Sequence, residues 1–319
     1  MSRRMLIGSL FLVVSGLLRA QTRLACWNLE NFFDTVDDTL TLDDAFTPQG
    51  ENHWTYSRFV RKRDMLYKTV AAMGYPALVG LVEVENGRVL DALCQGTPLR
   101  RQGYSWVHFD SPDRRGIDCA LLYRADKLRL LRSRPVGVSD TAEGFYTRDM
   151  LLVEGCLAQG DTLCVLVNHW PSRKGGIRAD NYRSRIAGRL RRVMDSLHTV
   201  HPDAWVVAMG DFNAAPGEVM RSMAKPVDSA SGGPLNLMAG LEPDPASYKY
   251  QGRWEWIDQI LCYTPTAEIL STLRGSVFTA PWLLAVDERY MGLKPLRTYR
   301  AMVYLGGVSD HLPVYVDLP

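Results

Sequence analysis

The stretch Ser309-Asp310-His311-Leu312-Pro313-Val314 near the C-terminus is the most informative part of this sequence, together with Gly210-Asp211-Phe212-Asn213 far upstream. Each joins ionisable or amide side chains to a hydrophobic run, 314–316 after the first stretch and 205–209 before the second. The runs are typical of buried strands. Carboxylates and an imidazole at the ends of core strands cost free energy unless they bind a metal or transfer protons. Both stretches are therefore candidate parts of a functional site.

Other segments along the chain repeat this design, in which a predicted core strand adjoins a polar cluster. They are residues 26–31 (CWNLEN), 80–86 (GLVEVEN), 168–173 (NHWPSR) and, at the opening of a strand, 256–260 (WIDQI). Carboxylate and amide oxygens are the ligands that Mg²⁺ or Mn²⁺ prefers, and the absence of paired Cys/His spacing argues against zinc. Two histidines, His169 and His311, remain for proton transfer.

Short apolar runs rich in β-branched residues predict strands over residues 24–28, 77–83, 104–109, 119–124, 151–157, 163–168, 205–209, 257–262 and 314–317. Two helices are expected as well. The first covers residues 57–73 and ends at Gly74, with Pro76 just beyond. The second covers 179–198, with an apolar face from Ile186 to Leu197 and several arginines on another face. Many strands with few helices indicate a layered α/β or α+β architecture.

Residues 1–20 are typical of a signal peptide. Arg3 and Arg4 form a basic start, residues 6–18 are a nearly unbroken apolar stretch too short to span a bilayer comfortably, and Ala20 is a small residue for cleavage. We expect an exported chain, periplasmic or extracellular, with no stable membrane span after cleavage. An uncleaved N-terminal anchor is the alternative.

The expected mature chain, residues 21–319, is close to neutral. Cleavage removes Arg3, Arg4 and Arg19 from 37 basic residues and no acid from 35, so any attraction to a polyanion must come from a local patch. A hydrophobic content of 46% spread along the chain predicts one large domain. The six cysteines lack C-x-x-C spacing and favour buried free thiols, although Cys156 and Cys164 flank a predicted turn and could form one bridge.

Two long excursions interrupt the strands. Residues 34–56 are acidic and aromatic, and residues 275–307 are rich in aromatic side chains and close on Gly306 and Gly307 just before the Asp-His pair. Connections of this length usually shape a binding site. No internal repeat is apparent, and no heptad suggests an oligomer, so we expect a monomer.

The ordered set W-N-L-E-N-F, L-x-E, N-H-W, G-D-F-N, I-D-Q-I and S-D-H-x-P-V resembles the endonuclease/exonuclease/phosphatase superfamily, with its deoxyribonuclease I-like fold, over nearly all of the mature chain. The N-H-W-P-S-R stretch, residues 168–173, is similar to that of secreted bacterial nucleases of the superfamily. The resemblance to the superfamily implies an α+β fold, a four-layer sandwich of two mostly antiparallel β-sheets flanked by helices, with the site at one end of the sandwich.

The resemblance also implies roles for individual residues. Asn28 and Glu83 would contact the metal, with Asp310 as a further ligand or close neighbour. The attacking water and the scissile phosphate would be oriented by Asp211 and Asn213. Proton transfer falls to His311 as general base, held by Asp258, and to His169, which would stabilise the developing charge or protonate the leaving oxygen.

Several assignments have competitors. Glu85 lies two residues beyond Glu83 and so on the same face of a regular strand, but Glu83 matches the L-x-E position of the family. Glu30 could also be a ligand, although capping or a nearby hydrogen bond is the favoured role. Asp118 is expected to orient His169 if the strand has the right register. As exposed basic residues, Arg148 and Arg173 could hold substrate phosphates.

The leading hypothesis is an exported Mg²⁺-dependent phosphodiesterase, with Mn²⁺ as the other candidate ion, that cleaves nucleic acid in the manner of an endonuclease. No cofactor other than a metal is expected. The alternative keeps the chemistry and changes the substrate, as in a phosphatase or a phospholipase C-type hydrolase acting on an inositol phosphate, sphingomyelin or another small phosphoester. A non-catalytic binding protein is disfavoured because the set of predicted site residues is intact.

Overall fold

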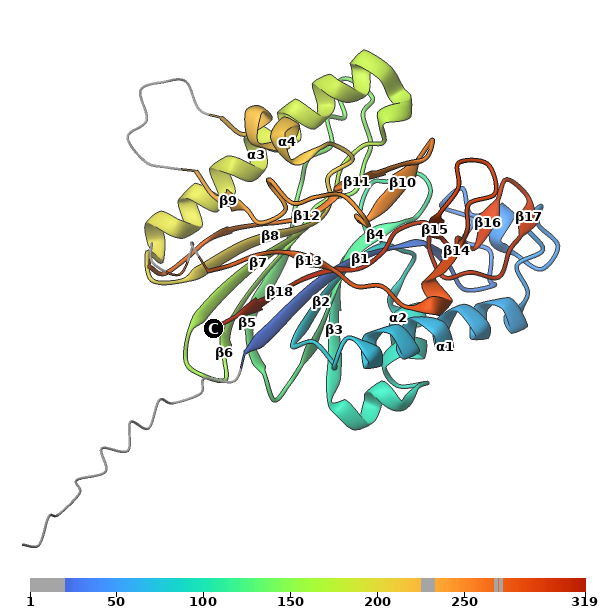
Figure 1. The fold of residues 1–319 in the computed structure, drawn as a ribbon, viewed down its shortest axis with the longest axis horizontal. Helices are drawn as coiled ribbons and strands as arrows, with labels where there is room; N and C mark the ends of the chain where they lie inside the picture. Colours follow the sequence, from blue (N-terminus) through green and yellow to red (C-terminus); the bar gives the residue numbers. More distant parts are fainter. Residues whose placement is uncertain (1–20, 225–232, 267–268, 270–271) are drawn as a thin grey trace, which may run out of the picture.

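The computed structural model describes residues 21–224, 233–266, 269 and 272–319, so the predicted signal peptide lies outside the described residues. Two six-stranded sheets pack face to face, and helices cover their outer faces (Figure 1). The first sheet has the order β13 (Ser276–Val277), β18 (Val314–Leu318), β1 (Thr22–Phe32), β2 (Leu78–Val84), β4 (Asp118–Arg124) and β3 (Tyr104–His108).

The second sheet has the order β5 (Leu128–Val136), β6 (Met150–Leu157), β7 (Thr162–His169), β8 (Trp205–Asp211), β12 (Asp258–Tyr263) and β9 (Leu235–Asn236). Within the two sheets, β1 pairs with β2 and β7 with β8 in parallel, while the remaining pairs are antiparallel. Three two-stranded ribbons stand apart from the sheets: β10 (Tyr248–Tyr250) with β11 (Arg253–Glu255), β14 (Leu284–Val286) with β15 (Leu293–Pro295), and β16 (Tyr299–Arg300) with β17 (Val303–Tyr304).

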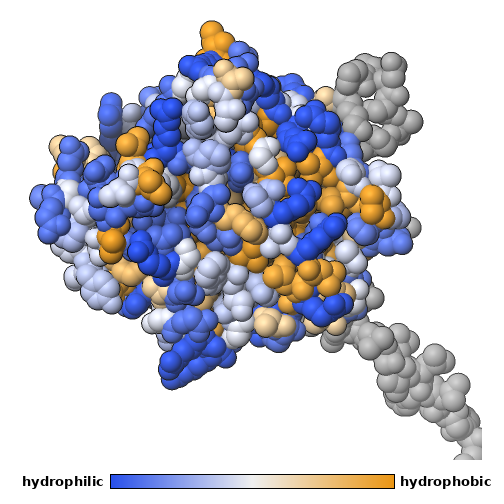
Figure 2. Space-filling view, turned by 180° about the vertical axis from the view of Figure 1, so that it is seen from behind, coloured by the Kyte–Doolittle hydropathy of each residue, from blue (hydrophilic) through white to orange (hydrophobic). Residues whose placement is uncertain are grey.

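Helices α1 (Tyr56–Ala72) and α2 (Gly87–Cys94) pack on the first sheet, and α3 (Gly176–Val200) and α4 (Pro216–Ser222) pack on the second. Single 3₁₀ turns occur at Asp44–Phe46, Pro98–Gln102, Arg173–Gly175 and Pro281–Leu283. None of the helices in the described ranges is long and apolar enough to cross a membrane. Over the face seen in Figure 2, hydrophilic residues are interspersed with hydrophobic ones.

Strand alternation explains the three apolar layers. Successive side chains of a strand point to opposite faces, so each sheet contributes one row to the centre and one to its helices. Cys26, Val165 and Val207 lie in the layer between the sheets, whereas neighbouring residues such as Trp27 and Leu166 face the helices. The observed layers are helix, sheet, sheet, helix, which confirms the predicted α+β sandwich.

The predicted elements occur close to their expected bounds. Helix α1 begins after Thr55, whose hydroxyl accepts a hydrogen bond from the backbone N–H of Arg58, and it is followed by Gly74 in a left-handed conformation with φ of 81°. Helix α3 extends three residues earlier and two residues later than predicted. The prediction did not include β5, because exposed arginines alternate with its apolar residues.

Cys156 and Cys164 do not form the disulfide bridge that the sequence left possible. The predicted turn exists, but the register of β6 and β7 places Cys156 opposite Thr162 and Cys164 opposite Glu154. All six cysteines are free thiols, and every one except Cys156 is buried.

Strand directions bring the polar clusters to one end of the sandwich. Strands β1, β2, β7 and β8 all end there, while β12 and β18 begin there. Asp258, for example, is the register partner of Asp211. The segments predicted to carry chemistry therefore meet although they are far apart in sequence.

Candidate active site

Asp211, the last residue of β8, lies at the centre of the cluster and is 2% exposed. Its Oδ2 atom accepts hydrogen bonds from the side-chain amides of Asn28 and Asn213, both at 3.1 Å, and its Oδ1 accepts the backbone N–H of Asn213 at 2.8 Å. Asn213 has φ of 47°, a left-handed conformation that turns its backbone N–H back toward the carboxylate. The carboxylate of Asp211 is thus fixed by three N–H donors.

His169 ends the neighbouring strand β7 beside this carboxylate. Its Nε2 atom lies 3.7 Å from Oε1 of Glu83 and 3.7 Å from Oδ2 of Asp211. Burial lowers the pKa of His169 well below its ordinary value, and the charges of Arg148, Arg115 and His311 lower it further. The imidazole of His169 is therefore neutral at pH 7.

His311 faces Asp211 from the other side. Its Nδ1 atom lies 2.7 Å from Oδ2 of Asp258, a carboxylate with no exposed surface, and its Nε2 lies 4.0 Å from Oδ2 of Asp211 and 3.8 Å from Oδ1 of Asp310. Burial by itself lowers the pKa of His311, but Asp258, Asp310 and Asp211 outweigh it and raise that pKa well above its ordinary value. The carboxylate of Asp258 therefore holds the ring of His311 in one orientation.

Glu83 reaches the cluster through an irregularity in β2. The pairing of β2 with β4 shifts between Val82 and Val84, so Glu83 is an extra residue, and its φ of 63° is left-handed. A non-glycine residue held in this region costs of order 1–3 kcal/mol, a strain that is characteristic of functional sites. The carboxylate of Glu83 accepts the backbone N–H of Asn31 at 2.8 Å while facing His169.

The same bulge separates Glu83 from its competitor Glu85. A regular strand would place both side chains on one face, but the extra residue breaks the alternation. Glu85 instead accepts the backbone N–H of Asp34 at 2.5 Å, and burial raises its pKa to about 8. Of the two residues, Glu83 is the one brought to His169.

A group of residues that the sequence did not single out holds Asp310 and Glu30. The guanidinium of Arg297 contacts Oε1 of Glu30 at 3.2 Å and Oδ2 of Asp310 at 2.7 Å. The buried amine of Lys62 donates to the backbone oxygen of Glu30 at 2.5 Å and to Oγ1 of Thr298 at 2.8 Å. These contacts hold the long connection 275–307, through Arg297 and Thr298, against the end of β1.

Glu30 occupies the role favoured in the sequence analysis, because it accepts the backbone N–H of Thr298 at 2.7 Å. Its pKa is raised to about 7 by burial and by Asp310, against the opposing charges of Lys62 and Arg297. Position 297 lies in the excursion expected to shape the site, but no local motif marks the arginine. Tyr248 is a second residue without a sequence signal, and its ring centroid is 4.8 Å from that of His311.

The expectation that Asp118 orients His169 is wrong. Oδ2 of Asp118 lies 3.2 Å from Nε2 of His108, and Oδ1 accepts the backbone N–H of Ser111 at 3.0 Å. Within the described residues, Nδ1 of His169 is buried without a hydrogen-bond partner. In the pairing of β2 with β4, Asp118 lies opposite Val84, beyond the bulge at Glu83. Its carboxylate therefore contacts His108, the last residue of the neighbouring strand β3, and not His169.

Of the two predicted phosphate-binding arginines, Arg148 is buried and Arg173 is exposed. Arg148 is 7% exposed, pairs with Asp113 at 2.9 Å and donates to the backbone oxygen of Trp170 at 3.0 Å. The expectation of an exposed Arg148 is wrong, since the residue is buried behind His169 and acts on that imidazole through its charge. Arg173 is exposed at the surface and forms an ion pair with Glu255.

The side chains brought together suit a hard divalent cation. Glu83 and Asp310 supply carboxylate oxygens and Asn28 an amide oxygen, which are the donors that Mg²⁺ and Mn²⁺ prefer. Asp211, Asp258 and His311 also have ligand atoms within 4.8 Å of one another, and Oδ1 of Asp258 is buried without a hydrogen-bond partner among the described residues. These oxygen donors, with the unpaired buried oxygen of Asp258, fit a divalent cation.

Solved structures with the same fold cover nearly the whole chain. D. rerio TDP2 complexed with single strand DNA product is 17% identical, with a TM-score of 0.56 over 94% of this chain and 99% of that chain. The human Nocturnin catalytic domain with bound sulfate is 17% identical, with a TM-score of 0.56 over 93% and 92% of the two chains.

A third structure with this fold is Bacteroides thetaiotaomicron mannosyl-6-phosphatase Bt3783. It is 16% identical, with a TM-score of 0.56 over 93% of this chain and 99% of that chain. Among curated proteins the comparison found no match. A family model described as "Endonuclease/Exonuclease/phosphatase family" matches residues 23–319. The chain therefore belongs to the endonuclease/exonuclease/phosphatase family of phosphoester hydrolases.

Proposed function

We propose that this protein is an exported, Mg²⁺-dependent phosphodiesterase that hydrolyses nucleic acid in the manner of an endonuclease. The observation that carries the proposal is the position of Asp211 between two histidines, His169 at 3.7 Å and His311 at 4.0 Å, with Glu83 and Asp310 beside them. We further propose that residues 1–20 are removed on export, and that residues 21–319 act as a single monomeric domain in the periplasm or outside the cell.

In the proposed reaction, Asp211 and Asn213 orient the attacking water and the scissile phosphate, because their polar atoms are fixed toward each other at 2.8 and 3.1 Å. His169 is neutral and carries a buried imidazole suited to donating a hydrogen bond to developing negative charge or to the leaving oxygen. His311 would take the proton of the attacking water, held in one orientation by Asp258.

The proposed base role of His311 depends on a cation. With three acidic neighbours the imidazole holds a proton at neutral pH, and a protonated imidazole cannot accept another. Asn28, Glu83 and Asp310 would hold Mg²⁺ or Mn²⁺, which offsets the acidic charge and polarises the phosphate oxygens. Charge balance thus supports metal dependence.

Nucleic acid is favoured as the substrate by two observations. A structure with this fold holds a single-stranded DNA product. In addition, the segment after His169 carries Arg173, Lys174 and Arg178, which place basic side chains close to the proposed site in sequence even though the mature chain is nearly neutral.

A small phosphoester is the second candidate substrate. One structure with this fold is a mannosyl-6-phosphatase, and the ribbon of β14 and β15 exposes Val286, Met291 and Leu293, apolar side chains that a lipid surface could cover. This candidate includes inositol phosphates and sphingomyelin, which a phosphatase or a phospholipase C-type enzyme would hydrolyse.

An activity panel tests the proposal. The mature protein is incubated with plasmid DNA, RNA, sphingomyelin and inositol phosphates in Mg²⁺ or EDTA, beside His311→Ala and, as a matched control, the variant His201→Ala, which alters a histidine outside the cluster. We expect cleavage of nucleic acid in Mg²⁺ by wild type and His201→Ala, and a loss of about a hundredfold or more in His311→Ala. Cleavage of small phosphoesters alone would favour the second candidate, and equal cleavage by His311→Ala would contradict both.

A further inference from the structure

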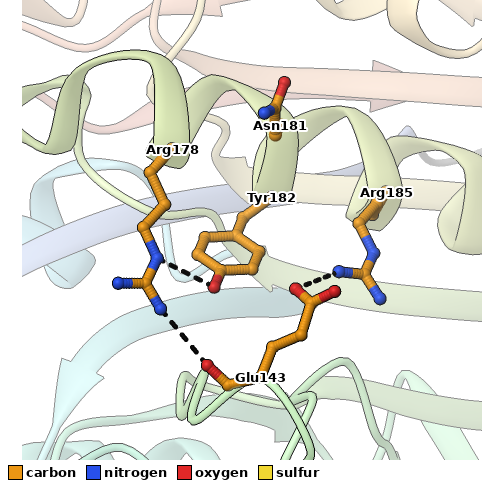
Figure 3. Close-up of a pocket in the computed structure, with 5 residues that line it drawn as sticks. All are labelled: Glu143, Arg178, Asn181, Tyr182 and Arg185. Atoms are coloured by element: carbon orange, nitrogen blue, oxygen red, sulfur yellow. Dashed lines mark hydrogen bonds and ion pairs between the residues drawn. The ribbon is translucent and has the colours of Figure 1, made fainter.

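Two adjoining hollows lie along one side of α3, outside the cluster around Asp211. The first, about 520 Å³, is lined by Glu143, Arg178, Asn181, Tyr182 and Arg185 (Figure 3). The second, about 390 Å³, is lined by the segment 137–139 and by polar side chains of α3 that include Arg185, Arg189 and Arg192. Arg185 lines both hollows, so they lie next to each other along the helix, and we call them together the α3 groove.

The arginines of the α3 groove follow one face of the helix. Arg178, Arg185, Arg189 and Arg192 are spaced by seven, four and three residues, which returns each side chain to nearly the same direction on a 3.6-residue helix. At 1.5 Å per residue the row is about 21 Å long. Along the axis of a duplex each strand carries a phosphate about every 3.4 Å, so the row is as long as a run of about six phosphates of one duplex strand.

The positive charge of this row is only partly neutralised. Arg185 pairs with Glu143 at 2.7 Å and also with Asp140. Arg178 donates to the hydroxyl of Tyr182 at 3.0 Å and to the backbone oxygen of Glu143 at 3.2 Å, and both are neutral acceptors (Figure 3). Within the described part of the chain, no carboxylate pairs with Arg189 or Arg192, and both side chains are exposed.

The groove starts at the end of the sandwich that carries the candidate site. Helix α3 follows His169 after a short connection and runs back along the second sheet (Figure 1). Strand β5 runs parallel to β7, because both are antiparallel to β6, so the segment 137–139 after β5 lies at the same end. A chain leaving the site along α3 would meet Arg178 first and Arg192 last.

We propose that the α3 groove binds the phosphate backbone of the nucleic-acid substrate, on the side of the scissile bond where the chain leaves the site. Arginine suits this task because its planar guanidinium offers two parallel N–H donors to phosphate oxygens. Ser139, Ser184 and Asn181 add neutral polar side chains to the lining. The groove recognises the backbone and not the bases, and long chains therefore bind better than short ones. This inference rests on the proposed function.

The test removes the two unpaired charges in the double variant Arg189→Gln/Arg192→Gln. The matched control, Arg100→Gln/Arg101→Gln, removes two exposed arginines from the 3₁₀ turn Pro98–Gln102, which packs with helices of the first sheet. Binding of a fluorescent 30-nucleotide single strand is measured by anisotropy in EDTA at several salt concentrations. Hydrolysis of bis(p-nitrophenyl) phosphate, which has a single phosphate and no flanking chain to follow the groove, is measured in Mg²⁺.

We expect the groove variant to bind the 30-mer about tenfold more weakly at low salt. The slope of log K against log salt should become shallower by about 1.4, since each lost phosphate contact to a single strand contributes about 0.7. Rates on the small diester and melting temperatures should stay within error of wild type, and the control variant should match wild type throughout. An unchanged slope in the groove variant, or an equal change in the control, would overturn the inference.

The two proposals fail in different ways. If wild type binds the 30-mer and the groove variant shows the shallower slope, but no nucleic acid is cleaved in Mg²⁺, the groove stands and the proposed reaction is wrong. If nucleic acid is cleaved and the slope does not change, the reaction stands and the groove is wrong. Absence of any salt-dependent binding by wild type would contradict the groove directly.

Discussion

At the scale of single residues, the site separates two histidines by their surroundings. His169 has cationic neighbours and a buried ring, while His311 lies among Asp258, Asp310 and Asp211. Their pKa values therefore move in opposite directions, and such separation is the usual means by which one site provides both proton donors and acceptors. The carboxylate of Asp258 is the contact that sets the orientation and tautomer of His311.

We accordingly predict that Asp258→Asn lowers kcat by about a hundredfold or more, because a neutral amide does not stabilise a protonated His311 and can turn its NH₂ group toward Nδ1, which selects the other tautomer. KM should change little if the substrate contacts lie elsewhere. The measurement is steady-state hydrolysis of a phosphodiester in Mg²⁺ with melting curves for both proteins. Asp126→Asn, an exposed acid paired with Arg124, serves as the control. A folded Asp258→Asn variant with wild-type kcat would contradict this assignment.

At the scale of elements, Lys62 of helix α1 connects the helix to two segments beside the candidate site. The side chain is 2% exposed, and its amine donates to the backbone oxygen of Glu30 in β1 and to Thr298 beside Arg297. Burial lowers the pKa of Lys62 to about 8, although Glu30, Glu83 and Asp310 act to raise it. One cation thus joins a helix, a strand end and the excursion that contributes Arg297.

Replacing Lys62 with Met keeps the apolar length of the side chain and leaves its buried acceptors without a donor. We predict that Lys62→Met lowers the free energy of unfolding by about 3 kcal/mol. Urea unfolding followed by circular dichroism measures the change. Lys68→Met removes the same charge from an exposed turn of α1 and should change stability by less than about 1 kcal/mol. Equal stability of the two variants would show that the contacts of Lys62 contribute nothing.

The sequence predicted the buried strands better than it predicted which residues meet at the candidate site. Apolar runs such as 205–209 predicted strands because both faces of β8 are buried, whereas β5 alternates arginines with leucines and carries no such signal. The bulge that selects Glu83 over Glu85 arises from pairing with β4, and no local pattern encodes it. Asp118 was assigned wrongly for the same reason, since its partner His108 is set by strand register. Arg297 reaches Asp310 only through tertiary packing.

At the scale of the whole molecule, folding shields most of the cysteines from solvent. Five of the six, Cys26, Cys94, Cys119, Cys164 and Cys262, lie in the apolar layers with at most 3% exposure. Burial raises the pKa of these thiols, to about 12 for Cys94 and Cys262 and to about 11 for Cys164. The thiolate is the reactive form, so a raised pKa and a closed core both protect them from oxidation in the compartment proposed here.

We therefore predict that a thiol reagent such as DTNB at pH 8 labels one cysteine in the native mature protein and six in denaturant without reductant. The native label should be Cys156, which is partly exposed beside the turn at Gly160, and Cys156→Ser should label at none. Buried thiols should react only as fast as the chain opens, because their protonated form at pH 8 is a poor nucleophile. Four reactive thiols in denaturant would mean that the protein holds a disulfide, which the register of Cys156 against Thr162 and Cys164 against Glu154 opposes.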